Sequence, residues 1–502
     1  MTAYFCSSLL KIRPGQRFDE KQKCVLYLAA NQHASCQIVV QQSGVASLVV
    51  DDTDLKRAGF GVELFEERFI RCGEKGLFPD PLVPVENKVF HKEQTILYLR
   101  IYAPKEMMAG FYNGRLRIKN DFEECALDVC VRVWGFAIPE TPTCKTAFGL
   151  ERQWIAALHG VPEHSEECQQ LYERYYEELL QHKISPYRMP YPVDDPRATV
   201  YMDDPRVVSF QIDELRVPYS TQKLKKCLDI LRSKKTWFKK GFFYPIDEPK
   251  NKSDYQELEK ISRRLASLEP NYRLVLPHYC PPVDKCYATA YDGMLGKVTI
   301  WCPESCLFDD ANYWTQSDEQ DLSLAPKLQA RCNAGDEVWW YVCCGPAGDY
   351  CNFFITMEAI RHRLLFTQQW MMGVQGLLYW DVNWWGEKDG TPLNPWDDMA
   401  TVKFINPNLY GDGSLLYNGT DGPVSSLRLE TIRDGIDDFE YLCLAEKLFG
   451  REKTLELVSQ IVTSLTAYTT DPEQVMRFYQ NLGQMIEQAL GKEKVAAKAE
   501  NV

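Results

Sequence analysis

The sequence lacks the features that mark membrane and nucleic-acid-binding proteins. No apolar run approaches the ~20 residues of a membrane-spanning helix, and residues 1–18 contain no basic segment followed by an apolar one, which predicts no secretory signal. The formal net charge is -13, whereas nucleic acids and anionic membrane surfaces are bound by clustered Lys and Arg. We therefore expect neither nucleic acid nor a membrane as a partner.

Motifs of cofactor and metal chemistry are also missing. The sequence has no P-loop, no GxGxxG after a strand and no HExxH. Its acidic pairs, Asp194-Asp195 and Asp203-Asp204, lack the spacing of a calcium-binding loop. The 18 cysteines include no CxxC pair, which favours free thiols in a reducing compartment. We predict a cytoplasmic protein with no cofactor and no metal.

A chain of 502 residues is too long for one hydrophobic core, so we expect several domains. Residues 1–140 carry short runs rich in β-branched and apolar residues, such as Thr95–Ala103 and Ala126–Val133, separated by turn signals. None of these segments shows a sustained helical period. The pattern predicts an N-terminal all-β sandwich over residues 1–140, followed by a linker.

Between residues 145 and 425, short apolar strands alternate with amphipathic helices. This alternation over nearly 300 residues predicts a (β/α)8 barrel of the TIM type. Its expected strands are Lys145–Leu150, Val207–Phe210, Gly241–Ile246, Arg273–Pro277, Lys297–Trp301, Glu337–Cys343 and Gly376–Tyr379, and its longest expected helix is Phe353–Met372. Residues 426–502 are expected to form helices that pack on the barrel.

Two adjacent acids end one of the predicted strands. Barrel enzymes hold their catalytic groups at the carboxyl ends of strands, and the run GFFYPIDEP at 241–249 ends in Asp247 and Glu248. Neighbours on a regular strand point to opposite faces, so both acids reach one site only if the backbone bends there. Pro249 favours an end to the strand. The competing interpretation is a solvent-exposed strand end at which Glu248 caps the next helix.

Aromatic residues gather at three other strand ends, and the chain contains 12 Trp and 27 Tyr. They are Trp301, the run Trp339-Trp340-Tyr341, and the run Tyr379-Trp380-Asp381-Val382-Asn383-Trp384-Trp385. Aromatic faces stack on sugars, although cores use them as well. Each ring taken alone is better explained as core, but three such strand ends beside a carboxylate pair are typical of a carbohydrate site.

Several longer motifs resemble glycoside hydrolase family 123, whose catalytic region is also known as domain of unknown function 4091. The matching stretches are YAPKEMMAGFYNGRLRI at 102–118, FYPIDEP at 243–249, WWYVCCGP at 339–346, GLLYWDVNWWG at 376–386, GDGSLLYNG at 411–419 and PVSSLRLETIRDGIDDFEYL at 423–442. The resemblance extends from about residue 95 to about residue 450. The tryptophan-rich block and the RDGIDDFEYL segment are its most specific parts.

This resemblance implies a retaining β-N-acetylgalactosaminidase in which the 2-acetamido oxygen of the substrate attacks the anomeric carbon and forms an oxazolinium ion. Such enzymes depart from the scheme in which a second carboxylate is the nucleophile. By position, Glu248 matches the general acid/base and Asp247 matches the residue that orients the acetamido group. Burial and its charged neighbour should raise the pKa of Glu248, whereas Asp247 must stay ionised.

For the substrate contacts we expect Trp380 and Trp384 to form walls of the sugar site, with Trp301 as a further wall. Tyr341 is expected to hydrogen-bond the acetamido oxygen, and Asn383 a sugar hydroxyl. Each of these residues also has a purely structural interpretation. Arg428, Arg433 and Asp434 match family positions too, but we expect them to pack and form ion pairs. Two alternatives stay open: a glycosidase of different sugar specificity, and a non-catalytic carbohydrate-binding protein.

Overall fold

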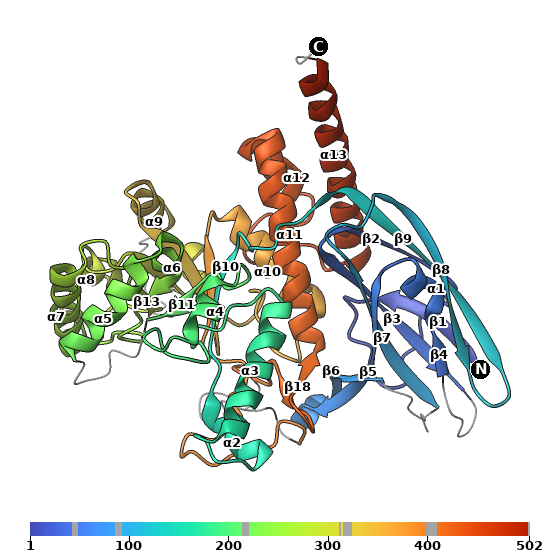
Figure 1. Ribbon diagram of the computed structural model, residues 1–502, viewed down its shortest axis with the longest axis horizontal. Helices are drawn as coiled ribbons and strands as arrows, with labels where there is room; N and C mark the ends of the chain where they lie inside the picture. The colour runs from blue at the N-terminus through green and yellow to red at the C-terminus, as the bar shows by residue number, and fades with distance from the viewer. Residues whose placement is uncertain are drawn as a thin grey trace.

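The computed structural model describes residues 1–42, 49–85, 93–212, 220–310, 313–314, 324–397, 399 and 409–499. Figure 1 shows sheets at one side, a β/α unit at the other, and the long helix α11 (Leu427–Phe449) between them. The chain thus has several sheets and several helices, as expected of a multidomain protein. None of the described helices is both long and apolar enough to cross a bilayer.

The N-terminal part is made almost wholly of strands, as its sequence predicted. They are β1 (Thr2–Ser7), β2 (Lys23–Ala30), β3 (Gln32–Gln41), β4 (Val49–Asp51), β5 (Gly61–Arg71), β6 (Leu77–Pro84), β7 (Gln94–Ala103), β8 (Gly110–Lys119) and β9 (Glu124–Ala137), with a short helix α1 (Thr53–Arg57). One sheet has the order β2-β9-β8-β4, and the other runs β1-β3-β7-β5-β6-β18-β17. Buried side chains from both sheets, including Leu28, Leu99 and Val131, form one core.

The second sheet is completed by strands from far along the chain. β17 (Tyr417–Asn418) pairs with β18 (Pro423–Ser426), and β18 pairs antiparallel with β6. Because α11 follows β18 directly, this pairing joins the start of the helix to the N-terminal sheet. The sandwich therefore includes residues from outside the 1–140 segment that the sequence assigned to it.

The β/α region alternates strands and helices. Its elements are β10 (Lys145–Phe148), α2 (Arg152–His159), α3 (Glu166–Gln181), α4 (Ala198–Asp203), β11 (Phe210–Gln211), α5 (Thr221–Arg232), α6 (Lys235–Lys240), β12 (Gly241–Phe242), α7 (Lys252–Leu268), β13 (Val275–His278), α8 (Ala290–Met294), β14 (Ile300–Pro303), α9 (Leu324–Asn333), β15 (Glu337–Val342), α10 (Ala359–Met371) and β16 (Gly376–Tyr379). The strands pair in parallel in the order β10-β16-β15-β14-β13, and β11 pairs with β12. Helix α10 begins at Ala359, six residues later than its sequence predicted.

Further parallel contacts connect the short pair β11–β12 to both edges of that sheet. Phe243 forms a parallel bridge with Leu274, just before β13. Phe148 of β10 forms another with Pro186, and the amide of Gln211 in β11 donates to the Tyr187 carbonyl at 2.7 Å. The short pair therefore lies between β10 and β13.

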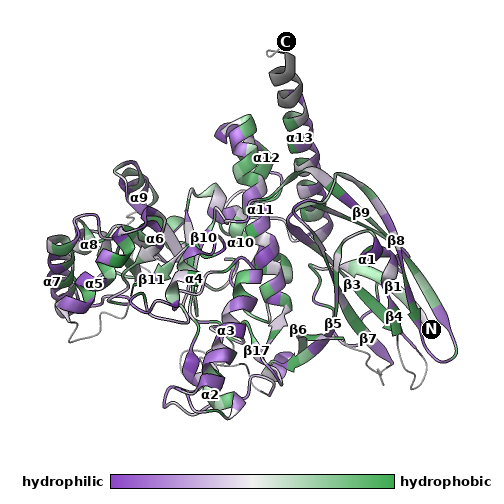
Figure 2. Ribbon diagram, viewed as in Figure 1, coloured by the Kyte–Doolittle hydropathy of each residue, from purple (hydrophilic) through white to green (hydrophobic). Residues whose placement is uncertain are grey.

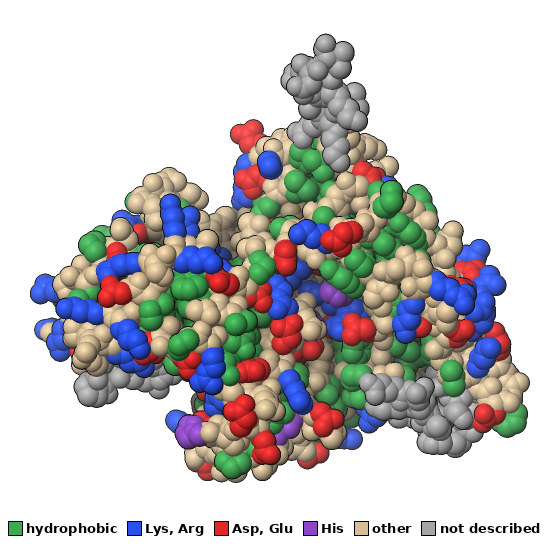
Figure 3. Space-filling model, in the orientation of Figure 1, with side chains coloured by type: hydrophobic (Ala, Val, Ile, Leu, Met, Phe, Trp, Pro, Cys, Tyr) green, Lys and Arg blue, Asp and Glu red, His purple; other side chains and the backbone are tan. Residues whose placement is uncertain are grey.

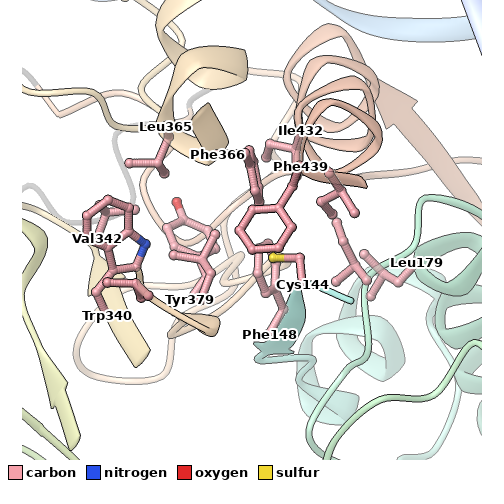
Figure 4. Packing of buried hydrophobic residues seen from close by; sticks show 14 of the residues in the cluster. Cys144, Phe148, Leu179, Trp340, Val342, Leu365, Phe366, Tyr379, Ile432 and Phe439 are labelled. Carbon is pink, nitrogen blue, oxygen red and sulfur yellow. The ribbon is translucent and has the colours of Figure 1, made fainter. Parts of the chain in front are cut away.

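Alternate residues of these strands belong to two different cores. Ala147, Phe242, Val275, Ile300, Cys302, Trp339, Tyr341 and Leu378 share one cluster, which is called the inner face below. Their strand neighbours turn the other way, toward the helices, as the two-residue period of a strand requires. Figure 4 shows Trp340, Tyr379 and Phe148 from the strands packed beside Leu365, Phe366 and Phe439 from the helices.

Helix α11 is buried along most of its length and ends near α12 (Arg451–Val458), with α13 (Pro472–Ala499) packed beside it. In Figure 2 hydrophilic and hydrophobic stretches alternate along α11. Arg428, fully buried, donates to both carboxylate oxygens of Asp80 in β6, at 2.9 and 2.8 Å. Arg433 pairs with Glu430 and Asp434. The expectation that these residues pack and form ion pairs is confirmed.

We predict that Asp80→Asn destabilises the protein by about 3–5 kcal/mol, because it leaves the buried Arg428 charge uncompensated. The denaturant midpoint of the transition that unfolds α11 measures the loss. Asp128→Asn is the matched control, since Asp128 and its partner Arg115 are 41% and 52% exposed and such a solvent-exposed pair contributes little to stability. Equal shifts in the two variants would contradict the prediction.

Candidate active site

Asp247 and Glu248 lie where the chain leaves β12 and bends. Glu248 has a φ of 44°, in the left-handed region that non-glycine residues seldom adopt, and it precedes Pro249. Such a conformation costs of order 1–3 kcal/mol and is often found where function requires it. The bend interrupts the alternation of side chains that a regular strand would have. Such a bend is what both acids need in order to reach one site.

Each acid accepts a hydrogen bond from a different tyrosine. The Tyr341 hydroxyl donates to Glu248 Oε1 at 2.7 Å, and the Tyr244 hydroxyl donates to Asp247 Oδ1 at 2.8 Å. Tyr341 belongs to the inner face and Tyr244 packs against it. Asp247 is exposed and Glu248 is about 25% exposed. Both carboxylates thus lie beside tyrosines that belong to the inner face or pack against it.

The surroundings of Glu248 favour its protonated form. Burial raises the pKa of Glu248 above its usual value, and the charge of Asp247 acts in the same direction. The hydrogen bond from Tyr341 and the charge of Lys250, whose Nζ lies 3.9 Å away, lower this pKa in part. The direction agrees with the expectation for a general acid.

A third carboxylate, Glu304, lies next to this pair and was missed by the sequence analysis. It follows β14 directly, is 1% exposed, and forms a parallel bridge with Tyr341. Its Oε2 accepts the indole N–H of Trp314, whereas its buried Oε1 has no partner. Burial raises the pKa of Glu304 to about 8, with a further contribution from Glu248. The strand-end criterion that identified Asp247 would also have identified Glu304.

Trp380 and Trp384 follow β16 and contact each other, with ring centroids 5.4 Å apart. The Trp380 indole donates to the buried Asp412 at 3.1 Å, and its ring lies so close to Gly413 that a Cβ there would approach it to 2.1 Å. The Tyr187 hydroxyl donates to the Trp380 carbonyl at 3.2 Å, and the Tyr187 ring packs edge-on against Tyr244. Tyr187 thereby connects Trp380 to Tyr244, which is the hydrogen-bond donor to Asp247.

Two of the predicted contact residues face away from this site. Trp301 is fully buried against Tyr291 of α8, with its indole donating to Asp336 at 2.8 Å. Its neighbours Ile300 and Cys302 occupy the inner face, so the alternation of the strand turns Trp301 toward the helices. Its prediction as a wall of the sugar site is corrected: Trp301 is a core residue.

Asn383 is also fully buried. Its side-chain amide donates to the Glu151 carbonyl at 2.9 Å, and its oxygen accepts the Glu151 amide at 2.8 Å. Both polar ends of the side chain are therefore used in joining the segment after β16 to the segment after β10. Its prediction as a ligand of a sugar hydroxyl is replaced by this structural role.

A surface hollow elsewhere in the structure contains none of these residues. It is lined by Glu173, Arg174 and Glu177 of α3 and by residues of the β17–β18 hairpin. Among the described residues, no group of three or more His, Cys, Asp or Glu side chains is arranged to hold a metal ion. On the face shown in Figure 3, acidic and basic side chains are interspersed.

Comparison with known proteins finds a similar structure and a family that matches part of the chain. The chain superposes over its full length on the full length of a family 123 glycoside hydrolase from Clostridium perfringens, with a TM-score of 0.66 and 12% identity. A Parabacteroides merdae β-glucuronidase (10% identity, 83% of this chain and 50% of that one) and a Cellvibrio japonicus xylanase (10%, 80% and 91%) superpose more loosely, with TM-scores of 0.30 and 0.28. No curated protein matches the chain in sequence.

Residues 285–445 match the family described as Glycoside hydrolase 123, catalytic domain. This match confirms the resemblance that the motifs indicated, and the full-length superposition shows that the two chains share a fold. The matched residues include Tyr341 and Trp380, whereas Asp247 and Glu248 precede them.

Glu304 provides a test of the buried site by protein stability. Its pKa of about 8 in the folded protein lies above the ~4.3 of an unfolded chain. The folded state therefore holds a proton that the unfolded state loses, so the stability contributed by protonated Glu304 is full below about pH 4 and declines up to about pH 8.

We predict that Glu304→Gln, which cannot ionise, gains thermal stability relative to the wild type as the pH is raised from 5 to 8. The unfolding midpoints of both proteins at the two pH values measure this gain. Glu456→Gln, on a residue 68% exposed, should show the same midpoint difference at both values. A difference for Glu304→Gln that does not change with pH would contradict the prediction.

Proposed function

We propose that this glycoside hydrolase removes terminal β-linked N-acetylgalactosamine with retention of configuration, through participation of the 2-acetamido group. The observation that carries the proposal is the adjacent pair Asp247 and Glu248. Glu248 has a left-handed backbone conformation, and the two carboxylates accept hydrogen bonds from Tyr244 and Tyr341 respectively. The relative from Clostridium perfringens is described as hydrolysing glycolipid glycans. A glycoconjugate with a β-N-acetylgalactosaminyl end is the corresponding substrate for this chain.

In the first step, protonated Glu248 gives its proton to the glycosidic oxygen. The C1–O bond breaks while the acetamido carbonyl oxygen forms a bond to C1, which yields an oxazolinium ion and the free alcohol. Asp247 accepts the acetamido N–H and stabilises the positive charge that develops on it. In the second step, the Glu248 carboxylate takes a proton from a water molecule while the oxygen of that water attacks C1. The bond between C1 and the acetamido oxygen breaks, which opens the oxazolinium ring.

The other predicted contacts take the following places in this proposal. Tyr341 orients Glu248 and donates to the acetamido oxygen, and Trp380 with Trp384 forms a wall beside the sugar. Trp380 suits this role because Asp412 and Gly413 hold its ring in one orientation.

The architecture that we propose around this site is a closed (β/α)8 barrel. The parallel contacts between Phe148 and Pro186 and between Phe243 and Leu274 support closure, because they connect β11–β12 to both edges of the larger sheet. The corresponding domains are a sandwich at 1–140, to whose sheet β17 and β18 are added, the barrel at 145–425 and the C-terminal helices at 426–502. A cytoplasmic location is supported by the 18 cysteines, all of which are free thiols.

We predict that Glu248→Gln lowers kcat by about 10²–10⁴-fold while sugar binding persists, since general acid/base catalysis contributes that much. Asp247→Asn should lower the rate on acetamido substrates as well. Chromogenic β-GalNAc, β-GlcNAc and β-Gal substrates assayed side by side measure both the loss and the specificity. An oxazoline-mimicking thiazoline should inhibit the wild type.

Glu456→Gln serves as the control for Glu248→Gln and should retain full activity. Faster cleavage of β-Gal than of β-GalNAc would instead support a glycosidase of different specificity. A Glu248→Gln variant that retains the wild-type rate would remove Glu248 from the mechanism.

The pH dependence gives a separate prediction. Because general acid catalysis needs protonated Glu248, kcat/KM should fall as the pH rises through its raised pKa. The hydrogen bond from Tyr341 lowers this pKa, so Tyr341→Phe should move the alkaline limb of the kcat/KM profile to higher pH. Tyr244→Phe, which removes the donor to Asp247 instead, is the matched control and should leave the limb in place. A downward shift in Tyr341→Phe would contradict the assignment.

A further inference from the structure

We infer that Trp314, held in place by Glu304 and Tyr279, is the platform on which the leaving group of the substrate stacks. This inference rests on the proposed function, and it adds a second binding position to the site. Trp314 is 41% exposed, the most exposed of the described tryptophans. Three contacts nevertheless fix the orientation of its ring.

The first contact is the hydrogen bond from the Trp314 indole to Glu304. Glu304 is a buried acid with an unpartnered Oε1, an arrangement that costs free energy. The second is the edge-on packing of Trp314 against Tyr279, with centroids 5.6 Å apart. The third is Gly345, where a Cβ would approach both Glu304 Oε1 and the Trp314 ring to 2.5 Å. The exposed ring is therefore held in one orientation by Glu304, Tyr279 and the close approach of Gly345.

The position of Trp314 relative to the two acids assigns its ligand. Tyr279 lies under the Lys250 ammonium, 5.3 Å from it, and Lys250 lies 3.9 Å from Glu248. Glu304, the partner of Trp314, lies beside Glu248 and Tyr341. All these contacts converge on Glu248, whereas Asp247 is joined through Tyr244 and Tyr187 to Trp380.

This division matches the two halves of the substrate. In the proposed reaction Asp247 holds the acetamido group, so the sugar that is cleaved off lies on the side of Trp380. Glu248 protonates the glycosidic oxygen, so the leaving group lies on the side of Trp314 and Tyr279. An exposed aromatic face of fixed orientation stacks on the C–H face of a sugar. The leaving group is therefore expected to be a second sugar residue.

The test compares a ligand that ends at the cleaved sugar with one that continues beyond it. Trp314→Ala should lower kcat/KM by about 10-fold for a disaccharide with β-linked N-acetylgalactosamine at its non-reducing end. It should leave unchanged the Kd of the N-acetylgalactosamine-configured thiazoline, measured by calorimetry. Trp314→Phe should retain most of the disaccharide activity. Phe122→Ala, on a side chain that is 85% exposed in the sandwich, is the control and should change neither value.

The role of Glu304 in positioning the ring is tested by two substitutions. Glu304→Gln still accepts the indole N–H and should keep the disaccharide kcat/KM, whereas Glu304→Leu should reproduce the loss seen in Trp314→Ala with thiazoline binding intact. The inference is overturned if Trp314→Ala leaves the disaccharide kcat/KM unchanged, or weakens thiazoline binding by the same factor. A wild-type protein that neither binds the thiazoline nor cleaves the disaccharide would instead overturn the proposed function, and the inference with it.

Discussion

Buried charge on helix α11 is the constraint on which the rest of the structure depends. Glu430, which is fully buried, accepts hydrogen bonds from Arg100 of β7 at 2.6 Å and from His182, which follows α3, at 2.8 Å. Arg428 meets Asp80 of β6. Removing Asp80 would leave the Arg428 charge uncompensated in a medium of low dielectric constant, and the Glu430 charge is balanced jointly by Arg100, Arg433 and His182. Since these partners come in part from the sandwich and from the β/α unit, the burial of the helix depends on both.

The same helix reaches the candidate active site through one short loop. Besides Asp80, Arg428 donates to the Gly411 carbonyl at 2.7 Å. The next residues, Asp412 and Gly413, hold the indole N–H and the ring face of Trp380. The orientation of a residue proposed to contact the sugar therefore depends on an ion pair with the N-terminal sheet. This chain of contacts gives the sandwich a role in the site that needs no contact with substrate.

Local rules predicted the parts of the fold and site that depend on nearby residues. The strand-end criterion led to Asp247, Glu248 and Tyr341. The strands that precede or carry them, β12 and β15, begin at the residues that the sequence predicted and end within a few residues of the predicted ends. Trp301 was misplaced because one aromatic residue gives no sign of which face it occupies until its neighbours are assigned. The addition of β17 and β18 to the sandwich sheet was missed, because such short strands pair with residues more than 300 positions away.

The neutrality of Glu304 has a consequence for the neighbouring acid. In the proposed mechanism Glu248 must first give up a proton and later take one back, so its pKa must be raised but not by too much. Tyr341 and Lys250 oppose the effect of burial on that pKa. An ionised Glu304 would add a second negative charge beside Glu248 and hold its proton more tightly. By burying Glu304 without a cation, the protein raises the pKa of this acid and favours its protonated form, which limits the negative charge beside Glu248.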